Sequence, residues 1–216
     1  MLFSFLKDLL FPVECLGCQA PGAWACAKCL RSINPGGPAI SLATSPLERP
    51  DKIYIAGDYN DPLLGEMIKK FKYNFITDLA APLSAFLSFY WSGQITLNPQ
   101  LSGAILVPIP LSRQRERWRG FNQAALLAEG LAGRLGLEVI PGLIRAKHRT
   151  AQARLTEAGR RKNINDAFQA TGRLPKQRTI ILIDDVVTTG ATLVEAAATL
   201  KKSGISQVSA LVLAKG

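Results

Sequence analysis

Residues 179–193 constrain the fold of this chain more than any other stretch does. Three isoleucines and a leucine at 180–183 form a short apolar run that predicts a fully buried strand. Two carboxylates follow directly, then a short loop of threonines around one glycine, and then Leu193 and Ala196 at helical spacing. The order of strand, acidic pair, small polar loop and helix is typical of an open α/β sheet, which binds ligands at the carboxyl ends of its strands.

The acids and the loop together predict a site for a sugar phosphate. Small residues let a backbone close around a phosphate, and a helix N-terminus directs free N–H groups at it. The loop residues are Val187, Thr188, Thr189, Gly190, Ala191 and Thr192. Asp184 and Asp185 would hold sugar hydroxyls or a hydrated metal ion and are the candidate catalytic residues. An acid-capped turn without a ligand would have the same sequence, so the pattern alone leaves both interpretations open.

Four cysteines form a second motif, with the spacing Cys-x2-Cys-x7-Cys-x2-Cys: Cys15, Cys18, Cys26 and Cys29. Two Cys-x-x-Cys pairs can supply four thiolates to one structural zinc ion. Disulfides are disfavoured if the protein is cytoplasmic, and a redox Cys-x-x-Cys is normally a single pair. Zinc is therefore the favoured interpretation, while an iron–sulfur cluster remains compatible with the spacing.

The N-terminal residues 1–15 are apolar enough to be compared with a signal sequence. Lys7 and Asp8 interrupt the apolar run, and no small-residue cleavage site precedes Cys15. Helical spacing of the leucines instead predicts a short amphipathic helix that docks on the body. No apolar run approaches the length of a membrane span, so we expect a cytoplasmic protein.

The charge of the chain is uneven. Its net charge is +10, and the excess lies in residues 113–178, which hold 15 Lys/Arg and 5 Asp/Glu. Arg113, Arg115 and Arg119 follow a predicted strand at 104–107, and guanidinium groups bind phosphate oxygens bidentately. The segment therefore predicts a polyanionic partner, pyrophosphate or nucleic acid, with Trp118 offering a ring for base stacking. A solvated basic surface is the alternative.

The segment before this basic stretch is predicted to be mostly helical. After a short strand at 53–57, two amphipathic helices are expected, the second at about 78–89. They are expected to form a cap beside the core. Lys72, Tyr73 and Tyr59 are weaker candidates for an acceptor pocket there.

Residues 180–192 resemble the 5-phosphoribosyl 1-pyrophosphate (PRPP) signature of type I phosphoribosyltransferases: four hydrophobics, two acids and a Thr-Gly-x-Thr loop. The cysteine pairs, the stretch from VPIP to RGFNQ and the RTAQARL segment complete an order similar to that of ComF-family proteins, which are associated with bacterial competence and DNA uptake. The resemblance implies an α/β type I phosphoribosyltransferase core with a mostly parallel sheet. It divides the chain into a zinc domain with linker (1–50), a helical cap (51–100) and the core (101–216).

The resemblance also implies roles for the candidate residues. Asp184 and Asp185 would face the ribose hydroxyls or the water shell of Mg²⁺, and residues 187–192 would bind the 5-phosphate. Pyrophosphate would face Arg113, Arg115 and Arg119, together with a flexible loop that holds Arg149, Thr150 and Gln152. The implied reaction displaces pyrophosphate from C1 of PRPP and needs no covalent nucleophile.

Two functions are compatible with these residues. The first is an Mg²⁺-dependent phosphoribosyltransferase with an unidentified acceptor. The second is a non-catalytic adaptor that senses PRPP and binds single-stranded DNA alongside other proteins of the competence machinery. An intact acidic pair and phosphate loop favour PRPP binding in both cases.

Overall fold

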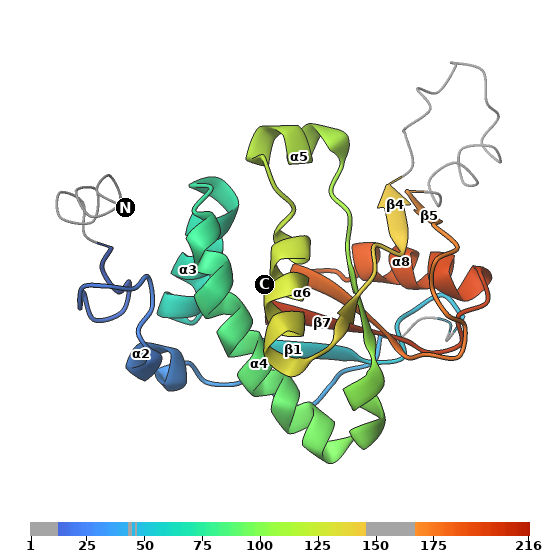
Figure 1. Cartoon of the computed structure of the whole chain (residues 1–216), viewed down its shortest axis with the longest axis horizontal. Helices are drawn as coiled ribbons and strands as arrows, with labels where there is room; N and C mark the ends of the chain where they lie inside the picture. Colours follow the sequence, from blue (N-terminus) through green and yellow to red (C-terminus); the bar gives the residue numbers. More distant parts are fainter. Residues whose placement is uncertain (1–12, 43–44, 46, 146–166) are drawn as a thin grey trace.

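A computed structural model of the protein describes residues 13–42, 45, 47–145 and 167–216 (Figure 1). The predicted N-terminal helix lies outside these residues, and so do Arg149, Thr150 and Gln152 of the expected flexible loop.

A five-stranded sheet forms the centre of the molecule. Its order is β1-β7-β6-β2-β3, and every neighbouring pair is parallel. The two longest strands, β6 and β7, are buried almost throughout, as expected for parallel strands that are covered on both faces. This arrangement confirms the predicted mostly parallel sheet. The strands are β1 (Ile53–Asp58), β2 (Ile105–Pro108), β3 (Glu138–Val139), β6 (Ile180–Val187) and β7 (Val208–Lys215).

Helices cover both faces of this sheet. On one face, α3 (Pro62–Tyr73), α4 (Ala80–Leu97) and α6 (Gln123–Leu135) pack against Ile181 and Ile183. On the other face, α8 (Ala191–Lys202) packs against Ile180 and Leu182. Successive side chains of a strand point to opposite faces, so β6 contributes residues to the apolar clusters on both faces of the sheet. The two 3₁₀ turns η1 (Thr77–Leu79) and η2 (Pro99–Gly103) precede and follow α4.

Two sequence-based boundaries were wrong. Strand β6 does not end before the acidic pair but continues to Val187, because β7 offers a pairing partner as far as Lys215. The second cap helix continues to Leu97, since no breaker interrupts it before Asn98 and Pro99. Local hydrophobic spacing did not set the end of either element. Pairing with β7 set the end of the strand, and the absence of a stop signal let the helix continue.

The arginine stretch after β2 forms a short helix, α5 (Arg113–Arg119), where the sequence suggested a loop. The hydroxyl of Ser112 accepts a hydrogen bond from the amide of Arg115 and caps its start. Gly120 ends the helix with a φ of 78°, a conformation that glycine adopts without strain.

The N-terminal region is joined to the sheet by a close-packed linker. The amide of Gly36 donates to the carbonyl of Ala56 at 2.6 Å, and Ile40 pairs with Ile53. These contacts cover part of the edge strand β1, which would otherwise leave backbone groups unpaired. The only helix described before β1 is α2 (Ala27–Ser32), which lies at one end of the molecule, while the antiparallel pair β4 (Leu143–Arg145) and β5 (Phe168–Ala170) lies at the other (Figure 1).

No helix among the described residues has the length and apolar character that crossing a membrane requires.

Candidate functional site

Two hollows meet at the carboxyl end of β6. The smaller, about 40 Å³, lies over the loop from Val187 to α8. The larger, about 480 Å³, extends from the acidic pair toward α3, α5 and β4. Asp184, Val186 and Thr192 line both hollows, so together they can hold one extended ligand.

The loop before α8 has the geometry of a phosphate site. Gly190 is the N-cap of α8 and adopts a φ of 78°, which turns the backbone toward the helix start. Thr188 and Thr189 are exposed beside it, and the hydroxyl of Thr189 accepts a long hydrogen bond from the amide of Ala191 at 3.4 Å. Free amides at the start of a 12-residue helix and the positive end of its dipole favour an anion here.

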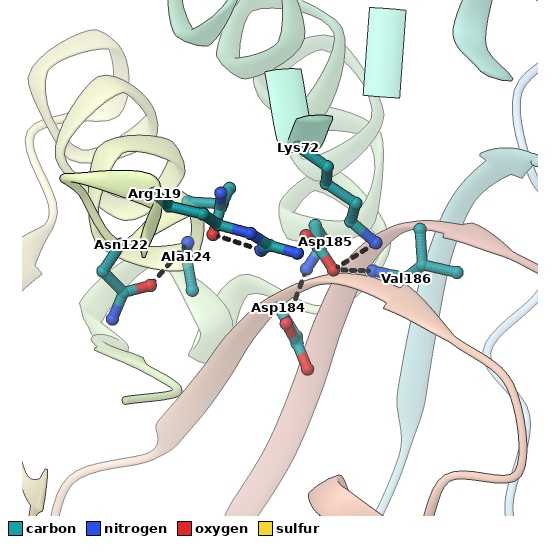
Figure 2. Close-up of polar contacts among 8 residues, drawn as sticks. Lys72, Arg119, Asn122, Ala124, Asp184, Asp185 and Val186 are labelled. Carbon is teal, nitrogen blue, oxygen red and sulfur yellow. Dashed lines mark hydrogen bonds and ion pairs between the residues drawn. The ribbon is translucent and has the colours of Figure 1, made fainter. Parts of the chain in front are cut away.

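The two aspartates have different surroundings because the pleat of β6 places them on opposite faces of the sheet. Asp185 is 8% exposed, and its Oδ1 accepts from Lys72 Nζ at 2.9 Å and from the Val186 amide at 2.7 Å. The Oδ1 of Asp184 accepts a local hydrogen bond from the amide of Asp185 at 2.9 Å, and the Asp184 carboxyl also interacts with that of Asp185. Asp184 therefore borders both hollows, while Asp185 is tied to the cap side of the larger one (Figure 2).

The burial of Asp184 has an electrostatic consequence. Burial, and then the negative charge of Asp185, raise the pKa of the Asp184 carboxyl to about 7. The nearby Lys72 ammonium acts in the opposite direction but does not cancel these effects. A carboxyl that titrates near neutral pH and lines a cavity is a common property of functional sites.

Four cationic side chains line the larger cavity: Lys72, Arg115, Arg119 and Arg145. Arg119 reaches toward the acidic pair, donates to Gln123 Oε1 at 2.8 Å and lies over the ring of Tyr73 (Figure 2). Nε of Arg119 and Nε2 of Gln123 are buried, and within the part of the chain that the structure describes they have no hydrogen-bond partner. Two unpaired donors in a cavity are costly unless a ligand acceptor reaches them, which favours an anionic or oxygen-rich occupant.

Of the predicted arginines among the described residues, two line the larger cavity and one does not. Arg115 and Arg119 line it, whereas Arg113 is exposed and not among the lining residues. Of the weaker candidates, Lys72 and Tyr73 line the cavity and Tyr59 does not.

Sequence reasoning missed three polar residues that line the larger cavity. Arg145 lies on β4, and no local signal placed that strand beside the acidic pair. Gln123 and Asn122 begin α6, where asparagine is a common N-cap. Asn122 accepts from the Ala124 amide and donates to the Ile109 carbonyl, both at 3.0 Å, so it fixes the end of β2 against α6.

The cysteines form a compact cluster in the N-terminal region. All four Sγ atoms lie within 4.8 Å of one another, and those of Cys18 and Cys26 are 3.7 Å apart. A tetrahedral Zn²⁺ with Zn–S bonds near 2.3 Å requires S···S distances of about 3.8 Å, so the cluster fits such an ion. A Cβ at Gly17 would lie 3.0 Å from Cys29 Sγ, so a larger residue would press into the cluster.

The thiols affect one another's protonation. Burial raises the pKa of Cys15, but amide donors, chiefly that of Cys26, outweigh it and lower that pKa to about 6. Contacts with Cys26 and Cys18 raise the pKa of Cys29 to about 12. Four thiolates at these distances repel one another, so a bound cation would be needed to ionise all of them.

Comparisons with known proteins agree with this geometry. A family model described as a phosphoribosyl transferase domain matches residues 122–216. Competence protein F of Haemophilus influenzae is 33% identical over 171 residues, 76% of this chain and 73% of that protein. DNA utilization protein YhgH of Escherichia coli K12 is 29% identical over 207 residues, 93% of this chain and 83% of that protein. Competence protein ComFC of Bacillus subtilis is 35% identical over 148 residues, 68% of this chain and 56% of that protein.

The parallel sheet and the matching family model define a protein with a phosphoribosyltransferase-type domain. A cluster of four cysteines able to hold a metal ion precedes that domain. The chain belongs to the ComF family.

Proposed function

We propose that this protein binds PRPP with Mg²⁺ and transfers its phosphoribosyl group to an acceptor, releasing pyrophosphate. The observation that carries the proposal is the junction of the two hollows at Asp184 and Thr192. A phosphate over the loop before α8 and a pyrophosphate among the arginines would leave the ribose beside the acidic pair. This is the order of groups along PRPP itself.

Each group at the site has a role in this proposal. Arg115 and Arg119 would neutralise the leaving pyrophosphate, as the sequence suggested, and we add Arg145 to them. Mg²⁺ would supply further positive charge at the leaving group, and Asp184 and Asp185 would face it through water or hold the ribose hydroxyls. Arg113 and the loop residues Arg149, Thr150 and Gln152 remain candidates for the pyrophosphate side.

Calorimetry with PRPP and Mg²⁺ tests the site. We expect the wild-type protein to bind and Asp184→Asn/Asp185→Asn to bind at least about tenfold more weakly, since both carboxylates lose their charge. Glu129→Gln on α6, an exposed carboxylate outside both hollows, is the control. Release of pyrophosphate with candidate acceptors then separates an enzyme from a sensor. If the wild-type protein does not bind PRPP, the assignment of this cavity as a PRPP site is wrong.

A second candidate is an adaptor that senses PRPP and binds single-stranded DNA in the competence machinery. Exposed aromatic rings at the cavity rim favour it: Trp118 is 59% exposed, and its ring meets that of Phe75 edge-on at 5.0 Å. Rings beside arginines suit unstacked bases and phosphates. We expect the affinity for a labelled single-stranded oligonucleotide to fall steeply as the salt concentration rises. We also expect the triple variant Arg115→Ala/Arg117→Ala/Arg119→Ala to bind the oligonucleotide more weakly than the wild-type protein does. Equal affinity in the variant and the wild-type protein would show that these arginines do not bind DNA.

We propose that the cysteine cluster holds one structural Zn²⁺. The donor set of four thiolates and the sulfur spacing support this choice over a site with an open position. We expect elemental analysis to find about one zinc per chain and Cys18→Ser/Cys29→Ser to lose it. Iron with a visible absorption band, or no metal, would contradict the proposal.

We propose that three segments of the chain have different roles. Residues 1–50 would carry the zinc site and linker, 51–100 the cap side of the cavity, and 101–216 the PRPP-binding core. We also propose that the protein is cytoplasmic; its four free cysteines support this location, because disulfides are disfavoured there.

A further inference from the structure

Lys72 makes the ion pair that joins α3 to the acidic pair. Its Nζ lies 2.9 Å from Asp185 Oδ1, and the two side chains are only 14% and 11% exposed. A buried ion pair adds little net stability, because both charges lose their hydration. Packing alone therefore gives a weak reason for a lysine at this position, and its place on the wall of the larger cavity suggests a role toward the ligand.

The contacts of Asp185 show what this lysine does. Oδ1 receives both the Lys72 ammonium and the Val186 amide, so two donors on one oxygen fix the orientation of the carboxylate (Figure 2). No contact with Oδ2 is present among the described hydrogen bonds and ion pairs, and Asp185 lines the larger cavity. Oδ2 is thus the oxygen that remains for a ligand hydroxyl.

The other cations of the cavity are arranged differently. Arg119 is held by Gln123 and by the ring of Tyr73, and Arg145 lies over the ring of Phe168 at 5.1 Å. Arg115 is exposed on α5. Among the cations lining the described cavity, Lys72 is the one with an ion pair to an acid of the PRPP motif.

We propose that Lys72 is a positioning residue of the PRPP site, which acts through Asp185. Together with the Val186 amide, its ammonium holds Asp185 so that Oδ2 accepts a ribose hydroxyl. This inference rests on the proposed function, and it adds a residue of α3, outside the signature motif, to ribose recognition. It also means that the docking of α3 against β6 strengthens the binding of the ribose.

Calorimetry with two fragments of the ligand tests the role. Ribose 5-phosphate carries the hydroxyls, whereas pyrophosphate carries none. We expect Lys72→Met to weaken ribose 5-phosphate at least about tenfold and to change pyrophosphate affinity less than about threefold, because the carboxylate loses its fixed orientation. Lys72→Arg should restore most of the affinity, since it keeps the charge.

The same helix provides a matched control. Lys70 pairs with Glu66 at 3.4 Å on the outer side of α3 and is 30% exposed. Lys70→Met makes the same chemical change without touching Asp185, and we expect it to leave both affinities unchanged. Asp185→Asn and Lys72→Met/Asp185→Asn should bind ribose 5-phosphate equally, because both residues act through one carboxylate.

The outcomes separate the possible roles. If pyrophosphate affinity falls and ribose 5-phosphate affinity does not, Lys72 contacts the ligand's phosphates directly and the proposal is wrong. If neither changes, Lys72 serves packing only. If Lys72→Met does not fold, the test is the comparison of Lys72→Met/Asp185→Asn with Asp185→Asn. Weaker binding of ribose 5-phosphate by the double variant would overturn the proposal. A wild-type protein that binds neither fragment instead overturns the proposed function itself.

Discussion

Asp184→Asn is expected to stabilise the ligand-free protein at pH 8 by about 2–4 kcal/mol, although it removes a proposed ligand group. Burial, and then the charge of Asp185, raise the pKa of Asp184 to about 7 from its ordinary value near 4. At pH 8 the folded protein must hold this carboxylate in its ionised form at a cost that the unfolded chain does not bear. Asparagine keeps the acceptor for the Asp185 amide and removes the charge.

The difference in stability between Asp184→Asn and the wild-type protein should change with pH in a known direction. Below about pH 4, Asp184 is protonated in both states, and the wild-type protein and the variant should be equally stable. As the pH rises from 4 through 7, the unfolded state ionises first, so the wild-type protein loses stability relative to the variant. Urea unfolding across this range measures the difference. A difference that does not vary with pH, or the same profile in Glu129→Gln, would contradict this explanation.

Gly36→Ala is expected to cost about 3 kcal/mol or more of folding free energy, from one methyl group in the linker. A Cβ at Gly36 would lie 1.7 Å from the carbonyl oxygen of Ile55, which belongs to strand β1. Backbone cannot move aside as a flexible side chain can, so the linker must leave the edge of the sheet. The 2.6 Å hydrogen bond from Gly36 to Ala56 would be lost with it.

The neighbouring glycine is a matched control. A Cβ at Gly37 meets no atom within 4 Å, so Gly37→Ala should change the midpoint of thermal unfolding little. Equal midpoints for the wild-type protein and Gly36→Ala would show that the linker does not depend on this contact. An equal loss in both variants would point to the flexibility of the linker rather than to the clash.

Local patterns predicted much of the core and of the anion site. The apolar run at 180–183, the helical spacing that begins at Leu193 and Ala196, and the turn around Gly190 all appear in the structure, as β6, α8 and the N-cap of α8. These signals work because the strand, the turn and the helix start each depend on residues adjacent in the sequence. The cysteine cluster was predictable for the same reason, since one short segment supplies all four sulfurs.

Other features required the folded chain. Nothing adjacent to Lys72 in the sequence shows that it pairs with Asp185, because long-range packing brings α3 and β6 together. Arg145 reaches the cavity through the pairing of β4 with β5, and Arg113 is exposed and not among the residues that line the cavity. The linker contains many Pro and Gly residues, and only the structure shows that Gly36 and Ile40 pair with residues of β1.

The sequence by itself therefore determined the elements of the PRPP motif and the candidate ligands of a metal. The tertiary structure alone decided that the two aspartates have different partners. Successive residues of a strand face opposite layers, so Asp185 meets Lys72 on the α3 side while Asp184 borders the phosphate loop on the α8 side. Which helix covers which face depends on long-range packing, and no pattern within 179–193 encodes it.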